Sequence, residues 1–117
     1  MKLNIEPTQI SAPGAPPPNV TCQDLYSTSA LNITWDAIPQ DQENGYLVGY
    51  IIKYRLIRQS GKDLPKDDSE VTVIFDRFVF AHEITGLVPY GIYQIDIYGY
   101  AKEGDGPMAT IFGGKRI

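Results

Sequence analysis

The chain has 117 residues and a formal net charge of −4 at pH 7, with 10 Lys and Arg against 14 Asp and Glu. This length suits one domain, which should bury roughly two-thirds of the surface exposed by the unfolded chain. Nucleic acids and anionic membranes are bound by clustered Lys and Arg, so an acidic chain with scattered basic residues is expected to bind neither. No apolar run reaches the roughly 20 residues of a membrane span, and the N-terminus lacks a signal-peptide pattern. We therefore expect no direct membrane insertion, and an extracellular location would require the chain to be a piece of a longer one.

Cys22 is the only cysteine. It cannot form an internal disulfide, and one thiol makes neither a redox motif nor a metal cluster. Two interpretations remain open: a small buried or half-buried hydrophobe near the first strand, or a bond to a cysteine outside this chain.

The N-terminal part divides into a linker and two strands. Residues 1–15 show no sustained period and run into a Pro-rich stretch, which cannot enter a sheet ladder, so they are predicted to be a linker or a disordered segment. The domain then begins at residue 16, with an edge-type strand over 19–25. Strict apolar and polar alternation over 30–35 predicts a second, half-buried strand that ends in Trp35.

Five further strands are separated by turn chemistry. Residues 36–45, 58–70 and 102–107 contain Gly or Pro together with charged side chains and are predicted to be loops. The strands are predicted over 47–57, 71–75, 78–84, 93–101 and 108–112, followed by a C-terminal tail over 113–117.

No stretch of ten or more residues combines a helical period with helix caps. The alternating segments instead predict an all-β sandwich of seven antiparallel strands. Its two sheets would hide their apolar faces against each other.

Four motifs distinguish between families of β-sandwich. They are the second strand ending in Trp35, the start of the third strand over 44–54, the Thr-Gly-Leu-x-Pro-x-Gly-x-Tyr corner within 84–93, and the Gly-Asp-Gly-Pro loop over 104–107. In this order they resemble a fibronectin type III domain over residues 16–112. The resemblance implies an immunoglobulin-like fold with strands A, B and E in one sheet and C, C′, F and G in the other. An immunoglobulin domain itself would carry its Trp on the third strand beside a disulfide, which a chain with one cysteine cannot form.

The resemblance also implies structural roles for individual residues. The ring of Tyr93 is expected to pack under the corner, while its hydroxyl bonds to the backbone a few residues upstream. Two features depart from the family pattern: a glycine at position 99 of the long strand, and a longer loop over 58–70. The residues with implied structural roles are Trp35, Leu87, Pro89 and Tyr93.

Two N-glycosylation sequons are present, at Asn19 with Thr21 and at Asn32 with Thr34. Alternation places the Asn32 side chain outward on the second strand, and Asn19 lies at the start of the first. We therefore expect both side chains to reach solvent and both to be glycosylated in the native host. The alternative is two ordinary surface asparagines.

No combination of side chains predicts catalysis. His82 is the only histidine and has no Ser or Cys nucleophile near it in the sequence pattern. The carboxylates of Asp63, Asp67, Asp68 and Glu70 lack the spacing and the glycine of an EF-hand, so no metal site is predicted. The sequence contains no phosphate loop, nucleophile elbow or zinc-ligand spacing. We therefore expect neither an enzyme nor a cofactor.

The outward side of the third and sixth strands is the strongest candidate for a protein contact. Apolar and aromatic groups rimmed by charge can mark protein interfaces, and Tyr is enriched at hot spots. The alternative is that tyrosines are good strand residues that cover one another across the pair. The residues predicted on this side are Ile51, Lys53, Arg55, Asp96, Tyr98 and Tyr100.

These observations predict a non-catalytic interaction and spacer module in the extracellular part of a cell-adhesion molecule or receptor. Its partners would be another protein and the neighbouring domains of its own chain, and the isolated chain would be monomeric. The Pro-rich start suits a semi-rigid joint between domains. Two alternatives remain: an accessory domain of a secreted carbohydrate-active enzyme, and an intracellular cytoskeletal module.

Overall fold

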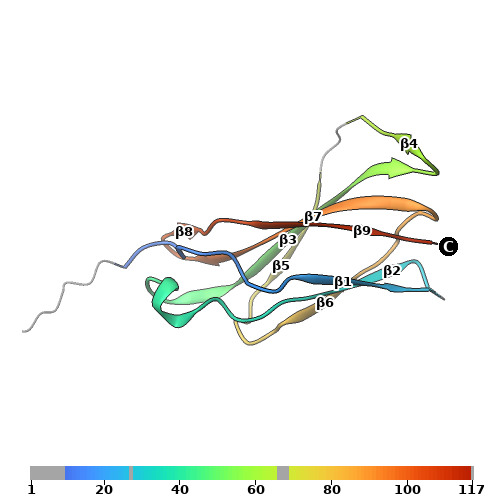
Figure 1. Cartoon of the computed structure of the whole chain (residues 1–117). Helices are drawn as coiled ribbons and strands as arrows, with labels where there is room; N and C mark the ends of the chain where they lie inside the picture. Colours follow the sequence, from blue (N-terminus) through green and yellow to red (C-terminus); the bar gives the residue numbers. More distant parts are fainter. Residues whose placement is uncertain (1–9, 27, 66–68, 117) are drawn as a thin grey trace, which may run out of the picture.

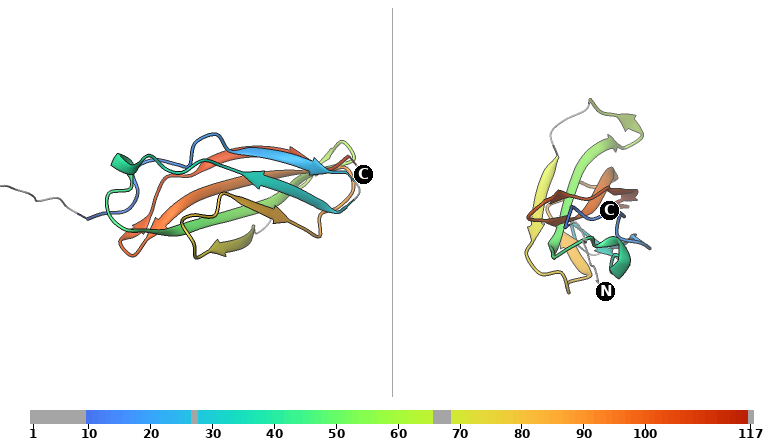
Figure 2. Two further views of the ribbon diagram at one scale, coloured as in Figure 1. Left: turned by 90° about the horizontal axis from the view of Figure 1, so that it is seen from below. Right: turned by 90° about the vertical axis from the view of Figure 1, so that its left-hand side faces the viewer.

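The structure is a computed structural model that describes residues 10–26, 28–65 and 69–116. Within these ranges the strands form two antiparallel sheets, which lie face to face (Figures 1 and 2). The part of the chain described contains no helix that is long and apolar enough to cross a membrane.

The smaller sheet has the strand order β1-β2-β6. It consists of β1 (Thr21–Leu25), β2 (Ala30–Thr34) and β6 (Ala81–Ile84). The period-2 alternation of β2 turns Leu31 and Ile33 to the inside, where both are fully buried.

The larger sheet is built on two long central strands, β3 (Leu47–Gln59) and β7 (Gly91–Ala101). β5 (Glu70–Ile74) pairs with β3, and β9 (Ala109–Gly114) pairs with β7. The two-residue strands β4 (Lys62–Asp63) and β8 (Gly104–Asp105) extend the ends of β3 and β7 as hairpins.

This arrangement confirms the predicted fold class. Strands β1, β2 and β6 correspond to A, B and E, and strands β3, β5, β7 and β9 correspond to C, C′, F and G. The 3-10 turn η1 (Gln40–Gln42) lies in the connection from β2 to β3. Figure 1 shows η1 and β8 at the same end of the sandwich as the described N-terminal segment, and the C-terminus at the opposite end.

The core fills the space between the two sheets. Trp35 follows β2 and Tyr50 lies on β3, and their rings pack edge to face with centroids 5.4 Å apart. Aromatic pairs favour this geometry because the positive edge of one ring meets the negative face of the other. The side chains on the inner parity of both central strands complete the core, which includes Ile52, Ile84, Leu87, Tyr93, Ile95 and Ile97.

Several strand ends differ from the prediction. The loop predicted over 58–70 is partly strand, because β3 continues to Gln59 and turns back through β4, and this hairpin stands out from the sandwich in Figure 1. Residues 75–80, in contrast, form a loop. There the Asp76 carboxylate accepts the N–H of Phe78 (2.9 Å), and such a local side-chain bond competes with the strand ladder.

The described part of the predicted N-terminal linker is attached to the domain. The N–H groups of Ser11 and Gly14 donate to the carbonyls of Asn44 and Gln42, each at 2.8 Å, and Pro13 is buried. The proline-rich chain therefore runs along the loop that leads into β3. The earlier part of that linker, residues 1–9, lies outside the described residues.

The C-terminal end of the domain is anchored by an ion pair. Strand β9 extends to Gly114, two residues beyond the predicted end, and the side chain of Lys115 is completely buried. Its ammonium group contacts the carboxylate of Asp24 on β1 and also donates to the carbonyls of Leu25 (3.1 Å) and Ala30 (3.3 Å). Residue 115 is therefore part of the packed domain and not of a free tail.

Candidate protein-binding face

Three rows of side chains cross the solvent side of the larger sheet, which we call the outer face. The opposite parity of β3 and β7 is fully buried at Tyr50, Ile52, Ile95 and Ile97, and successive strand residues alternate sides, so the remaining parity must face outward. Read from β5 toward β9, the rows are Val73–Ile51–Tyr98, Val71–Lys53–Asp96–Thr110 and Arg55–Gln94–Phe112.

The centre of the outer face is a chain of hydrogen bonds. Arg55 donates from Nη2 to Oε1 of Gln94 (2.8 Å), and Gln94 donates from Nε2 to both carboxylate oxygens of Asp96 (3.3 Å each). The hydroxyl of Thr110 donates to Asp96 at 2.6 Å. These bonds link β3, β7 and β9, so the polar centre of the face has a fixed arrangement.

Tyr98 is not part of the exposed surface, although it was predicted there. Its parity is outward, but the side chain is only 5% exposed, and the ammonium group of Lys53 lies 5.6 Å from its ring centroid. Tyr98 lies on a central strand directly opposite Ile51 of β3, and Lys53 of the same strand lies over its ring. The alternation pattern correctly gives the side of the strand on which Tyr98 lies, but it does not give the exposure of the side chain.

Tyr100 is half-buried. Its ring packs edge to face with Phe75, with centroids 6.5 Å apart and an interplanar angle of 84°. Its hydroxyl is buried and makes no hydrogen bond with the described residues, and desolvation raises the pKa of this group. The other predicted residues of this face, Ile51, Lys53, Arg55 and Asp96, are likewise half-buried.

The exposed apolar area lies on the flanks of the outer face. Phe75, which directly follows β5, is 78% exposed, and Phe112 on β9 is 61% exposed. Val71, Val73 and Met108 are also exposed. The sequence pattern did not identify the exposed valines of β5. In the run Val71 to Ile74 every residue except Thr72 is apolar, so alternation does not show which side of the strand faces solvent. The pairing with β3 decides it.

The outer side of the smaller sheet has a different composition. Its register places Thr21 beside Thr34, Gln23 beside Asn32, and Asn32 beside Glu83. The described strands β1, β2 and β6 contribute no large hydrophobic side chain to the exposed surface, whereas β3, β5, β7 and β9 contribute Val48, Val71, Val73, Ile92 and Phe112. The two faces of the sandwich are therefore chemically distinct.

The corner before β7 brings together three of the four residues with implied structural roles, and the fourth, Trp35, packs against Tyr50 in the core. The hydroxyl of Tyr93 accepts the N–H of Val88 at 2.8 Å, five residues upstream, and the Tyr93 ring is buried. Leu87 is buried and its N–H donates to the carbonyl of Ser29 (2.9 Å), while Pro89 is exposed. These bonds join the corner to β7 and to the turn between β1 and β2.

The glycine at position 99 has a steric explanation. A Cβ atom there would lie 2.5 Å from Cδ1 of Ile38 and 2.9 Å from Cδ1 of Leu47, both in the core. The departure from the family pattern at Gly99 therefore leaves no gap, because neighbouring side chains occupy the space.

A cavity of about 770 Å³ lies beside the corner that precedes β7. Its walls combine polar and apolar groups, and its charged lining residues are Arg55 and Glu70. Among the described residues, no three His, Cys, Asp or Glu side chains are grouped as metal ligands. Two carboxylates of the acidic group without EF-hand spacing, Asp67 and Asp68, lie outside the described residues.

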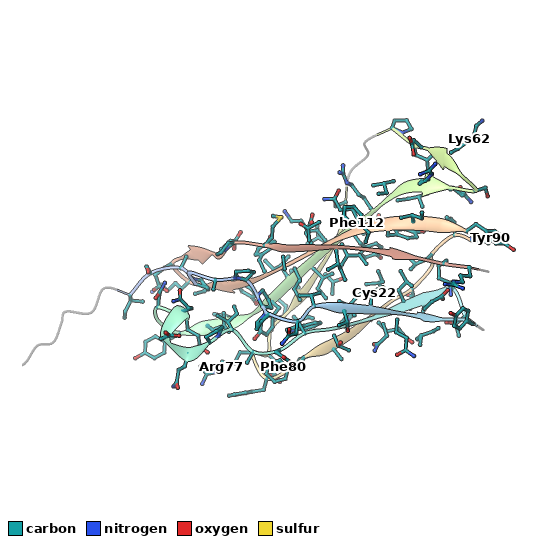
Figure 3. The ribbon with its side chains drawn as sticks, in the orientation of Figure 1. Cys22, Lys62, Arg77, Phe80, Tyr90 and Phe112 are labelled. Carbon is teal, nitrogen blue, oxygen red and sulfur yellow. The ribbon has the colours of Figure 1, made fainter. Side chains whose placement is uncertain are left out.

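Cys22 lies on β1 and is half-buried between the sheets (Figure 3). Its sulfur occupies the space beside Gly113 on β9, where a Cβ atom would come within 2.5 Å of Sγ. Burial raises the pKa of the thiol, and the nearby charge of Asp24 adds to that shift. Its surroundings are those of a small core side chain.

Comparison with known proteins supports the architecture. The chain is 34% identical to protein sidekick-1 of Gallus gallus over 99 residues, and 29% identical to contactin-6 of Homo sapiens over 110 residues. These alignments cover 85% and 91% of the chain but only 4% and 10% of the relatives. The chain thus spans a small part of the length of the curated relatives it matches.

Solved structures share the fold. The solution structure of the third fibronectin III domain of human KIAA0343 protein superposes with a TM-score of 0.77 at 20% identity, covering 99% of this chain and 93% of that one. The family model of the fibronectin type III domain matches residues 15–112, which includes both sheets up to Phe112 on β9. On this match, and on the two-sheet topology that accompanies it, the chain belongs to the fibronectin type III family.

Proposed function

We propose that this domain is a non-catalytic protein-binding and spacing module in the ectodomain of a cell-adhesion molecule or receptor. The observation that carries the proposal is the difference in composition between the solvent-facing sides of the two sheets. Exposed large hydrophobic side chains on the described strands belong only to the larger sheet. Exposed apolar patches on a soluble domain mark sites of contact with other proteins.

The relatives support the extracellular part of this proposal. Sidekick and contactin proteins are cell-adhesion proteins. Each is much longer than this chain, which covers 4% of sidekick-1 and 10% of contactin-6. A module of such a protein would work beside neighbouring domains of the same polypeptide. The anchored ends of this domain, at Gly14 and at Lys115, suit a spacer because the backbone would enter and leave the sandwich along fixed paths.

The outer face has the features of a recognition surface. Its polar centre is held by hydrogen bonds, so little side-chain entropy would be lost when a partner covers it. Phe75 and Phe112 on its two flanks offer aromatic contact area, and aromatic residues are enriched at interfaces. A partner that spans the sheet would bury both flanks.

A binding screen against a panel of cell-surface ectodomains tests the proposal. The face variant Phe75→Ser with Phe112→Ser should lose at least about tenfold in affinity for a bound ectodomain, since truncation of a hot-spot residue costs about 2 kcal/mol or more. The matched control changes the other sheet, Gln23→Ala with Glu83→Ala, and should bind as the unmodified chain does. A screen with no binder, or a binder that is equally sensitive to both variants, would contradict the assignment of this face.

A further inference from the structure

The two sequons lie on neighbouring strands of the smaller sheet. Their threonines, Thr21 on β1 and Thr34 on β2, are direct cross-strand partners, and their hydroxyls hydrogen-bond to each other. The asparagines of the two sequons are placed very differently.

Asn19 is exposed and precedes β1, outside the ladder of hydrogen bonds. Its backbone has a positive φ of 55°, a conformation that Asn tolerates better than most residues, so the chain turns sharply just before the strand. Its side-chain nitrogen donates one hydrogen bond to the carboxylate of Asp36 at 2.7 Å. Of the two hydrogens on that amide nitrogen, this bond uses one.

Asn32 lies on the central strand of the three-stranded sheet. The register places it between Gln23 and Glu83, and its side chain is half-buried. Alternation along the strand predicted that this side chain reaches solvent. In the folded domain its neighbours on both sides restrict access to the Asn32 amide.

We propose that Asn19 is an N-glycosylation site, occupied in preference to Asn32. The inference rests on the proposed extracellular function, because the reaction takes place in the secretory pathway. The donor is a lipid-linked oligosaccharide pyrophosphate. Its C1–O bond breaks, a bond forms between C1 and the amide nitrogen of Asn19, the nitrogen loses one proton, and the lipid pyrophosphate leaves.

The structure accommodates the product of this reaction. An N-linked asparagine keeps one amide hydrogen, and that hydrogen can maintain the bond to Asp36. Asn19 itself precedes β1 and stays exposed after folding, whereas Asn32 lies between two neighbouring strands once β2 has paired. The physical basis of the preference is this difference in access.

Glycosylation at Asn19 is compatible with the proposed binding face. Asn19 leads into β1 of the smaller sheet, whereas the outer face belongs to β5, β3, β7 and β9. The exposed surface of the smaller sheet is polar, which suits a hydrated glycan, and the apolar flanks of the other sheet remain available to a protein partner.

The test is secretion of the full chain from animal cells behind a cleavable signal peptide, followed by intact mass measurement before and after removal of N-glycans. Site occupancy is read by enzymatic release in ¹⁸O-water, which converts a glycosylated Asn to a labelled Asp. We expect a glycan that Asn19→Gln removes and Asn32→Gln retains, and occupancy at Asn19 at least several-fold above that at Asn32.

Two further variants separate loss of the sequon from damage to the fold. Thr21→Val should remove the glycan at Asn19 while keeping the asparagine, and Thr21→Ser, which preserves the sequon, should retain it. A secreted chain without a glycan, or occupancy at Asn32 equal to or above that at Asn19, would overturn the proposal. Expression imposes the secretory route, so the site is tested independently of the native location, which imaging of the endogenous protein would establish.

Discussion

Removal of the Asp24 carboxylate should strongly destabilise the domain. The ammonium group of Lys115 contacts this carboxylate and two backbone carbonyls, and its side chain has no exposure to solvent. The second carboxylate oxygen accepts the N–H of Arg116 at 3.0 Å. Asp24→Ala would therefore leave a buried positive charge without its counterion and an amide without its acceptor.

The magnitude follows from the burial of the pair. Removing one partner of a buried ion pair costs about 3–5 kcal/mol, a large part of the roughly 5–15 kcal/mol that stabilises a typical domain. Replacing both partners by apolar side chains is often neutral, because no charge is then left in the interior. Asp24→Leu with Lys115→Met should therefore recover most of the stability lost in Asp24→Ala.

The pair should also make stability depend on pH. Desolvation alone would raise the pKa of Asp24, but hydrogen bonds from Lys115 and the Arg116 N–H, with the charges of both residues, lower it below its ordinary value. The unfolded chain then binds this proton more readily than the folded domain does. The stabilisation is fully present above the unfolded pKa of about 3.9 and is lost as the pH falls through the lowered folded value.

Urea denaturation of the unmodified chain, Asp24→Ala, the double variant and Asp24→Asn, measured from neutral to acidic pH, tests this reasoning. The unmodified chain should lose more unfolding free energy between about pH 4 and pH 2 than Asp24→Asn, which has no carboxylate to protonate at that position. A loss below about 1 kcal/mol in Asp24→Ala, the scale of an exposed ion pair, would refute the reasoning.

Four further substitutions probe the packing of the domain, each measured as the unfolding free energy in denaturant. Tyr93→Phe should cost about 1–3 kcal/mol because the Val88 N–H loses its acceptor, and an unchanged midpoint would show that water replaces the hydroxyl. Gly99→Ala should cost about 1–3 kcal/mol, since the new Cβ meets core side chains at 2.5 and 2.9 Å; a more stable variant would mean that this region is loosely packed. Tyr98→Ser should lower the unfolding free energy clearly more than Phe112→Ser does, because Tyr98 is buried and Phe112 is exposed. The loss in Phe112→Ser should stay within about 0.5 kcal/mol. Equal losses in the two variants would contradict the burial of Tyr98.

Much of the fold could be predicted from the sequence because its strands carry local signals. Leu31 and Ile33 on β2, and Ile95 and Ile97 on β7, alternate with polar side chains, and all four are fully buried. A period-2 pattern of this kind assigns each residue to one side of a strand before any partner strand is known. The corner motif that leads to Tyr93 then distinguishes the family.

The candidate face could be only partly predicted. Ile51, Lys53 and Asp96 lie on the outer side as parity indicated, but parity does not say how tightly neighbouring strands cover a residue. Tyr98 is buried because it lies in the middle of the sheet, and Phe112 is exposed because β9 is an edge strand. These differences come from position across the sheet, which a pattern along the chain does not contain.

The sequence by itself determined the two-sheet architecture, the family and the two sequons. Each depends on short motifs or on alternation within single strands, whose residues are close together along the chain. Tertiary structure alone decided that Lys115 is buried against Asp24, 91 residues away along the chain. It also decided that the Asn19 side chain is exposed and the Asn32 side chain half-buried. Such contacts depend on which strands the folded chain brings side by side. Their energetic weight comes from burial, which is a property of the assembled sandwich.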